Sequence, residues 1–423
     1  MRGKRWVYPW VLGFVVVLAG AQGVLAAGFA LYEGSARGNA LGGALVGRAD
    51  DPSALYYNPA GITQLPGLQL MAGATIIMPT TDVTIGGIRE TTKDNVWIPP
   101  HLYATYQFSD RLWFGLAMYS PFGLGTEFDE NWLGRYNSYK ALIETFSVNP
   151  NVAFKLTDKL SLAAGFSVMY FDLTLDRKIP TGQPFWPFPM PWVGDVDADL
   201  TGDSFGYGWN VALHYQPCEY AKFGIAYRSQ VKQNLSGSAK FTIPAVGENI
   251  YRPFLHNTDA TGAVTLPDEV YVGLAVYPMK NLSLELGGVW TGWSDYSQLV
   301  IAYDRPVAGR KVSVVSKDWH DVWRLNFGIE YKPLNWLDLR FGYVFDEEPI
   351  PDRTVDYLVP ANDRHLFSFG PGFHWNNWTL DVSYTYLLIT DRDVEGRPLD
   401  GVFTGKFENG DAHMVGVSLG YKF

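Results

Sequence analysis

From Gly67 to its last residue, this chain alternates apolar with small or polar side chains in steps of two. The C-terminal segment 413–423 shows the pattern most clearly, with five apolar residues on one face: Val415, Val417, Leu419, Tyr421 and Phe423. The same division recurs in segments 323–332, 337–345 and 378–386. Because successive side chains of a strand point to opposite faces, each segment reads as a β-strand with one apolar face. That face fits either the core of a soluble sandwich or the lipid-facing surface of a membrane barrel.

The lengths of the connections favour the barrel. We predict about 14 strands by their composition and punctuation, at 68–78, 96–108, 111–119, 140–156, 160–176, 203–216, 220–234, 268–278, 281–303, 318–332, 336–346, 364–375, 378–390 and 411–423. Short turns alternate with long connections near 79–95, 120–139, 177–202, 235–267, 304–317, 347–363 and 391–410. A meander with every short turn at one end is the plan of outer-membrane barrels, whose short turns are periplasmic. The chain is therefore predicted to be an all-β protein, a transmembrane antiparallel β-barrel with both termini at the periplasmic end.

Residues 1–26 have the composition of a secretory signal peptide. A basic start precedes an apolar run, and small residues surround a cleavage point before Ala27. An anchoring helix is disfavoured, because the run is shorter than the ~20 apolar residues that a spanning helix needs. The mature chain is thus expected to be exported and to cross the outer membrane with strands alone. Cys218 has no second cysteine to pair with, so no disulfide framework is expected.

Residues 27–67 lack the alternation and are rich in small residues. Glycines there permit tight turns and close approach to surrounding walls. Turn signals occur at Asp51-Pro52-Ser53, Asn58-Pro59-Ala60-Gly61 and Leu65-Pro66-Gly67. A soluble domain could also begin with such a loop, but ahead of a barrel the segment reads as a plug, or hatch, in the lumen. The predicted division is a signal peptide at 1–26, the hatch at 27–67 and the barrel at 68–423.

Composition and motifs argue against several functions. Charged residues make up 18% of the chain, against the ~25% of a typical soluble domain, and the net charge is −10. Nucleic acid is therefore not an expected partner, since phosphate binding needs clustered Lys and Arg. The sequence has no GxSxG, HExxH, P-loop or Cys/His metal spacing, and no His–Ser spacing that suggests an outer-membrane phospholipase. We expect no enzyme activity, no metal site and no cofactor.

Several short motifs follow one another along the mature chain. They are Ala27-Gly28-Phe29, Gly38-Asn39-Ala40, Ala49-Asp50-Asp51, Asn58-Pro59-Ala60-Gly61, the run from Ser120 to Phe128, Leu266-Pro267-Asp268, Trp290-Thr291-Gly292-Trp293-Ser294 and Tyr421-Lys422-Phe423. Each is weak alone, but in this order they resemble the FadL family of outer-membrane long-chain fatty acid transporters. That family also includes TodX-like channels for aromatic hydrocarbons.

Loops 120–139 and 177–202 are unusually apolar for surface loops. Exposed apolar patches commonly mark binding, so we expect these loops to bind a hydrophobic substrate. The alternative is that they pack on each other over the barrel mouth, and both can hold because a groove needs walls. The residues concerned are Phe122, Leu124, Phe128, Trp132, Phe185, Trp186 and Trp192.

A break in the barrel wall is expected near Pro121. Proline cannot donate to a ladder, and the glycines around it loosen the backbone, so strand pairing should fail locally. In the FadL family an inward kink of the third strand opens a lateral path from lumen to membrane, and the resemblance assigns this opening to Ser120, Pro121, Phe122 and Gly123. The alternative is that Pro121 simply ends its strand.

The resemblance also implies an anchor and a gate. Basic side chains approach a bound head group in the family, and the matching residues are Arg177 and either Lys317 or His320; the alternative is that these are rim charges. The N-terminal aromatic lies in the family's ligand pocket, which implies that a ligand displaces Phe29. Asn58, Pro59 and Ala60 complete the expected gate, with Asn58 as latch, unless they form an ordinary Asn-Pro turn.

The leading hypothesis is therefore passive uptake of hydrophobic molecules, with long-chain fatty acids as the first candidate. Aromatic hydrocarbons taken up by the same route are one alternative, and an adhesin or structural barrel is another. The expected partners are the hydrophobic substrate and outer-membrane lipid. No energy-coupling partner is expected, since the hatch has no extra periplasmic segment for one, and a monomer is expected.

Overall fold

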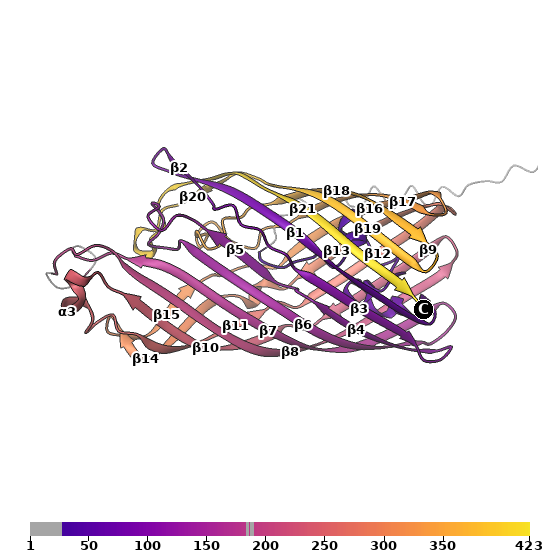
Figure 1. Ribbon diagram of the computed structural model, residues 1–423, viewed down its shortest axis with the longest axis horizontal. Coiled ribbons are helices and arrows are strands. Elements are labelled where there is room, and N and C mark those ends of the chain that lie inside the picture. Colours follow the sequence, from indigo (N-terminus) through magenta and orange to yellow (C-terminus); the bar gives the residue numbers. More distant parts are fainter. Residues whose placement is uncertain (1–27, 183–185, 187–189) are drawn as a thin grey trace, which may run out of the picture.

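A computed structural model describes residues 28–182, 186 and 190–423, and the predicted signal peptide lies outside them. The chain forms a closed antiparallel β-barrel of 14 strands, which confirms the predicted fold class (Figure 1). Its axis is horizontal in Figure 1, and the chain ends at the rim where the short turns lie. The fold therefore places the long connections together at the opposite, extracellular end.

The barrel strands follow one another around the wall in chain order. They are β1 (Leu68–Ile85), β3 (Pro100–Gln107), β4 (Leu112–Tyr119), β6 (Lys140–Lys155), β7 (Leu160–Ile179), β8 (Val196–Cys218), β9 (Ala221–Arg228), β12 (Glu269–Met279), β13 (Leu282–Thr291), β16 (Val322–Leu334), β17 (Leu337–Asp346), β18 (Arg364–Trp375), β19 (Trp378–Ile389) and β21 (Gly405–Lys422). The barrel closes because β1 pairs with both β3 and β21, in registers that set Leu68 against Tyr106 and Gln69 against Lys422.

Side chains alternate across the wall as the sequence predicts. Val417 and Leu419 are 44% and 42% exposed, whereas Ser418 between them is fully buried. The exposed apolar residues form the lipid-facing surface of a membrane barrel. Exposed tryptophans at the periplasmic turns, Trp336, Trp375 and Trp378, suit the membrane interface. In the described part of the chain, no helix has the length and apolar character needed to cross a membrane.

Two of the predicted long loops are largely strands instead. β10 (Val231–Thr242) and β11 (Thr258–Leu266) occupy most of 235–267, and a hairpin of β14 (Gln298–Val307) and β15 (Arg310–Ser316) replaces 304–317. These strands extend the wall beyond the membrane, because the upper part of β8 pairs with β10, which pairs in turn with β11. A strand with water on its outer face can be polar, so its composition resembles that of a loop.

Smaller elements complete the extracellular end. They are β2 (Ile88–Thr91), β5 (Gly123–Glu127), β20 (Arg392–Val394), α3 (Glu248–Tyr251), η3 (Ala245–Gly247), η4 (Trp293–Asp295) and η5 (Pro398–Asp400). β5 pairs with the upper part of β6, above the point where β4 leaves it. The strand formed by β4 and β5 is therefore interrupted between Tyr119 and Gly123.

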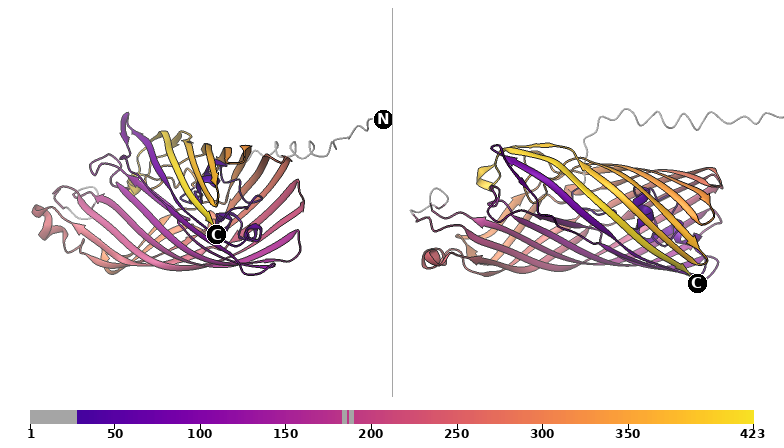
Figure 2. Two further views of the ribbon diagram at one scale, coloured as in Figure 1. Left: turned by 45° about the vertical axis from the view of Figure 1, so that its right-hand side comes forward. Right: turned by 45° about the horizontal axis from the view of Figure 1, so that its top comes forward.

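The segment from Gly28 to Gly67 lies inside the barrel (Figure 2). It contains α1 (Ala36–Ala40), α2 (Ala54–Tyr57) and η2 (Pro59–Gln64), which are almost wholly buried. Arg37 of α1 joins this hatch to the wall, with a salt bridge of 2.9 Å to Glu330 on β16 and others to Asp50 and Asp51. The lumen wall thus carries charges that the hatch neutralises.

Arg48 makes a second buried connection between hatch and wall. Its guanidinium lies 3.3 Å from Glu285 on β13 and also donates to the carbonyl oxygens of Ala44 and Gly328. Glu285 in turn accepts backbone hydrogen bonds from Gly47 and Arg48. Both charged side chains are fully buried, so neither has water as an alternative partner.

Replacing Arg48 with alanine should loosen the hatch without dissolving the barrel. Removing one partner of a buried ion pair leaves the other charge uncompensated, which costs about 3–5 kcal/mol. We expect larger and noisier single-channel conductance in planar bilayers. Arg89→Ala is the control, because Arg89 is more than half exposed and far from the hatch. Equal conductance of Arg48→Ala and wild type would show that Arg48 does not hold the hatch.

Candidate functional site

The interruption of the third barrel strand is filled by the start of the hatch. The Leu31 N–H donates to the Pro121 carbonyl at 2.9 Å, and the Gly123 N–H donates to the Phe29 carbonyl at 2.9 Å. Ala30 and Phe122 form an isolated antiparallel bridge. Since proline has no N–H, Pro121 cannot continue an ordinary ladder, and the free backbone groups beside it pair with the hatch instead.

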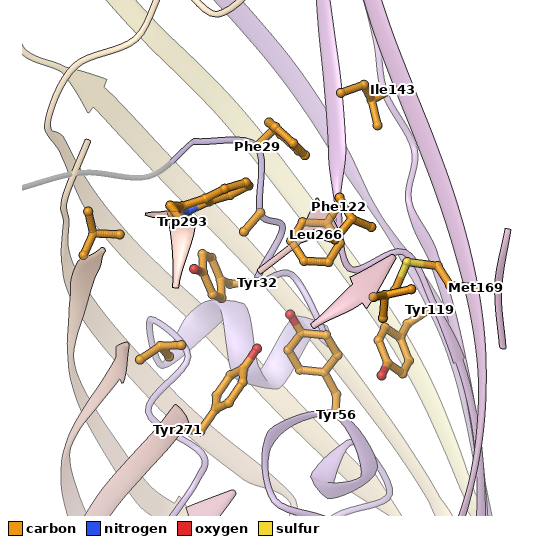
Figure 3. Packing of buried hydrophobic residues seen from close by; sticks show 14 of the residues in the cluster. Phe29, Tyr32, Tyr56, Tyr119, Phe122, Ile143, Met169, Leu266, Tyr271 and Trp293 are labelled. Carbon is orange, nitrogen blue, oxygen red and sulfur yellow. The ribbon is translucent and has the colours of Figure 1, made fainter. Parts of the chain in front are cut away.

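Phe29 lies at the centre of an aromatic cluster, which Figure 3 shows in part. Its ring centroid lies 4.7 Å from Trp293, 5.6 Å from Trp319 and 6.2 Å from Phe122. Tyr296 completes the cluster at 5.9 Å. Most of these contacts are edge-to-face, which is the favourable geometry for aromatic pairs.

Gly28 allows Phe29 to reach this position. Its φ is +51°, and a Cβ atom there would lie 2.8 Å from the rings of Trp293 and Trp319. Both the backbone conformation and the space require glycine. The glycine is therefore part of the site.

A cavity of about 310 Å³ opens beside Phe29, between the hatch and the wall. Its lining is mainly apolar and comes from the hatch, the interrupted strand, β1, β6, β18, β19, β21 and the loop before β18. Among the lining residues are Phe29, Trp97, Phe122, Leu124, Ile143 and Leu387. Its volume falls in the range of small-molecule sites, which are about 300–1,000 Å³.

One end of this cavity is charged. Arg324 of β16 and Arg364 of β18 share the carboxylate of Asp346, at 2.7 Å and 2.9 Å. The Nε atoms of both arginines have no hydrogen-bond partner among the described residues. Arg324 also lies 4.3 Å above the Tyr32 ring, and Glu33 lines the same end. The pair therefore places two guanidinium groups at the lining of an apolar cavity, with their unpaired Nε–H groups buried.

A smaller cavity lies on the other side of Phe29. It is lined by Leu124, Phe171, Leu173, Trp319 and Lys317, among others. Phe29 lines both cavities, as do Leu124, Ile143 and Val359, so its ring is one part of the wall between them.

The three basic residues expected to anchor a head group lie in different settings. Lys317 lines the smaller cavity and is fully engaged with Asp356 at 2.6 Å. Burial lowers the pKa of Lys317, but the attraction of Asp356 outweighs it and the pKa is raised, so the ammonium stays charged. Burial lowers the pKa of His320, which lines neither cavity, so its imidazole is a poor anion anchor at neutral pH. Arg177 is exposed and also lines neither.

The apolar loop residues divide into two groups. Phe128 and Trp132 are buried and stacked at 3.9 Å, and Trp132 contacts Tyr357, so they form the packed cover of the barrel mouth. Trp186 packs on Tyr251 of α3, and Trp192 is 75% exposed. Of the predicted binding residues, Phe29, Phe122 and Leu124 line the large cavity, and Phe185 lies outside the described residues.

Asn58 is buried at the junction of the hatch and the wall. Its amide donates to the carbonyls of Val46 and Leu213, at 3.0 Å and 3.1 Å, and its Oδ1 accepts from the Ala60 N–H. Leu213 belongs to β8, so one side chain links two parts of the hatch to the wall. Pro59 begins η2, where its missing N–H is not needed.

Sequence reasoning missed Trp97, Arg324 and Arg364, and did not place Trp293 or Trp319 in the site. Trp293 and Trp319 lie in interruptions between strands, where alternation carries no signal. The sequence does give a signal for Arg324, because it is an arginine on the inward face of a strand whose outward face is apolar. Among the described residues, no group of three His, Cys, Asp or Glu could hold a metal ion.

Comparisons with known proteins agree with this geometry. A sequence model of the family described as "Outer membrane protein transport protein (OMPP1/FadL/TodX)" matches residues 17–423. The chain is 27% identical over 456 residues to the long-chain fatty acid transport protein of Escherichia coli (strain K12), covering 97% of this chain and 98% of that one. The crystal structure of a Pseudomonas aeruginosa FadL homologue superposes with a TM-score of 0.82 at 20% identity, over 94% and 100% of the two chains. The Pseudomonas putida toluene transporter TodX superposes with a TM-score of 0.71 at 16% identity, again over 94% and 100%.

Replacing Asn58 with alanine should loosen the hatch, because it removes both the donors to Val46 and Leu213 and the acceptor for Ala60. Asn58→Asp retains the acceptor alone, which separates the two contributions. We expect single-channel conductance in planar bilayers to rise in both variants, more in Asn58→Ala. Asn131→Ala, in an exposed loop, is the control. Unchanged conductance of folded Asn58→Ala would remove Asn58 as the latch.

Proposed function

Because the chain belongs to the OMPP1/FadL/TodX family of outer membrane transport proteins, we propose that this transporter of hydrophobic compounds takes up long-chain fatty acids by passive diffusion. The observation that carries the proposal is the large apolar cavity with the Arg324–Asp346–Arg364 group at one end. An aliphatic chain suits the apolar lining, and a carboxylate suits the two guanidinium groups. A fatty acid combines both.

The binding of the head group is proposed to centre on Arg364. Asp346 balances one of the two guanidinium charges, which leaves the other to attract an anion against the opposing carboxylates of Glu33, Glu144 and Asp411 in the same lining. Lys317 is the second candidate, since it is charged and lines the smaller cavity, but Asp356 already neutralises it. Arg177 and His320 are weaker candidates, because neither lines a cavity.

The proposed route begins at the apolar extracellular loops and ends in the membrane. A ligand entering from the barrel mouth displaces Phe29, which lines both cavities together with Leu124, Ile143 and Val359. Because residues 29–31 also pair with residues 121–123, moving Phe29 frees the backbone at the interruption of the third strand. Asn58, Pro59 and Ala60 then set how far the hatch can move. The route needs no energy-coupling partner, and we propose a monomer.

Aromatic hydrocarbons are the second candidate substrate. The cluster of Phe29, Phe122, Trp293, Tyr296 and Trp319 could stack on a flat ring. Such a ligand has no carboxylate and would leave the arginine donors unused. The two candidates therefore differ in their dependence on Arg364, and an adhesin or purely structural barrel would transport neither.

The test measures binding and uptake of radiolabelled oleic acid and toluene by the purified protein in liposomes. Arg364→Ala should weaken oleic acid binding roughly tenfold to a hundredfold, since a hydrogen bond to a charged group contributes ~1.5–3 kcal/mol. Toluene uptake should stay unchanged. The fold should survive, because Arg324 still pairs with Asp346.

Matched variants decide where the head group binds. Arg353→Ala is the control, because this arginine is exposed in the loop before β18 and lines no described cavity. Lys317→Ala and Arg177→Ala test the other anchors. If Lys317→Ala or Arg177→Ala loses oleic acid binding while Arg364→Ala keeps it, the head group binds at that other residue and not at Arg364. If the wild type takes up toluene but not oleic acid, the protein is a hydrocarbon channel. If it takes up neither, the proposed transport function is wrong.

A further inference from the structure

We propose that the Trp97 indole is the barrier and size filter of the lateral exit, where it closes the wall by resting on Gly125. This inference rests on the proposed function. It identifies the side chain that a transported molecule must displace on its way from the cavity to the lipid. The argument starts from residues 92–99, here called the strap, which lead from β2 to β3.

The strap follows β1 closely on one side. The N–H and carbonyl groups of Trp97 exchange hydrogen bonds with those of Ile77, at 2.8 Å and 2.9 Å, and the Thr75 N–H donates to the Pro99 carbonyl. At its start, the Thr92 N–H donates to the Thr81 carbonyl. The strap therefore extends the wall beyond the end of β3.

On its other side the strap meets β5 at a single backbone hydrogen bond among the described residues. The Lys93 N–H donates to the Glu127 carbonyl at 2.7 Å, and the Lys93 and Glu127 side chains form a salt bridge at 2.8 Å. Lower down, β3 and β4 pair as far as His101 and Tyr119. Between these two points, residues 94–100 and 120–126 face each other without ladder pairing.

The hatch seals the lower part of this gap. Its residues Phe29 and Leu31 bind the backbone of Pro121 and Gly123, as described above. Above Gly123 the backbone has no such partner from the hatch. Three prolines border the gap, Pro99, Pro100 and Pro121, and none can donate a hydrogen bond across it. A side chain must therefore close the upper part.

Trp97 is that side chain. Its ring lies so close to Gly125 that a Cβ atom added there would be 2.1 Å from Trp97 Cε2. Trp97 and Gly125 both line the large cavity. Trp97 also packs on the inner-wall cluster of Ile77, Leu366, Leu387 and Met414. The indole thus spans from the β1 side of the gap to β5 and closes the cavity at that point.

The contacts of Trp97 favour displacement by an apolar ligand. Its indole N–H has no hydrogen-bond partner in the described structure, so moving the ring breaks no hydrogen bond. A chain that fills the cavity touches the same apolar surface and can replace the contacts that the ring loses. On either side of Trp97, Val96 and Ile98 are more than half exposed and already present apolar surface at the wall.

The test compares rates of transfer of radiolabelled oleic acid into liposomes for wild type and Trp97→Ala. We expect transfer to accelerate roughly threefold to tenfold, because the variant removes the aromatic contacts that close the gap. The variant should accelerate the transfer of methyl-branched phytanic acid, which is wider, more than the transfer of oleic acid. The transfer rate of Trp97→Phe should lie between those of wild type and Trp97→Ala, because phenylalanine restores part of the ring.

Gly125→Ala tests the same contact from the opposite side. Its methyl group must push the Trp97 ring away, so the single variant should also accelerate transfer. In a Trp97→Ala background the methyl group has room, and the double variant should match Trp97→Ala alone. Independent sites would instead give additive effects. Trp336→Ala, at the periplasmic rim, controls for the loss of a tryptophan.

The possible outcomes separate this inference from the proposed function. If wild type transports oleic acid, and both Trp97→Ala and Gly125→Ala transport it at the wild-type rate, Trp97 is not the barrier. The transport function then still stands. Slower transfer in folded Trp97→Ala would also overturn the barrier, since it would make the ring part of the ligand's path. If wild type transports no hydrophobic ligand, the proposed function itself fails.

Discussion

One constraint governs the whole structure: within the bilayer, every backbone N–H and C=O group must form a hydrogen bond with another group of the protein. Lipid offers no such partner, so a spanning sheet must close on itself, and here β1 closes it by pairing with β3 and β21. An interruption in such a wall exposes polar groups that water cannot reach. At Pro121 the hatch supplies the missing partners through Phe29 and Leu31. The hatch is thus part of the wall as well as a plug in the lumen.

The same need explains the charges in the lumen. A hatch rich in glycine and short helices has many backbone groups that its own secondary structure leaves free. The wall meets them with inward side chains such as Glu285, which accepts from Gly47 and Arg48, and Asn326, which donates to Gly42. Buried pairs such as Arg48–Glu285 then fix the position of the hatch, because either partner alone would be costly. The ends of the hatch can move only as far as these contacts allow.

The sequence predicts the wall much better than the site. Alternation at Val417, Ser418 and Leu419 follows directly from the lipid on one side, so the strands and their faces could be predicted residue by residue. The extracellular strands β11 and β15, the end of β14 and most of β10 could not, because water on their outer face weakens the apolar signal. Trp293 and Trp319 meet from two separate interruptions of the sheet, and only the folded chain brings them together around Phe29.

Phe29 contacts both the interrupted wall and the cavity. Its carbonyl accepts from the Gly123 N–H at the interrupted strand, while its ring lines both cavities. In the route proposed above, a ligand that takes the place of the ring acts on a residue whose backbone also pairs with the interrupted strand. Because a ligand shifts an equilibrium only by its differential affinity, the coupling is strongest for molecules large enough to need the space of the ring. In that route, a small solute that fits beside Phe29 would leave its hydrogen bond to Gly123 intact.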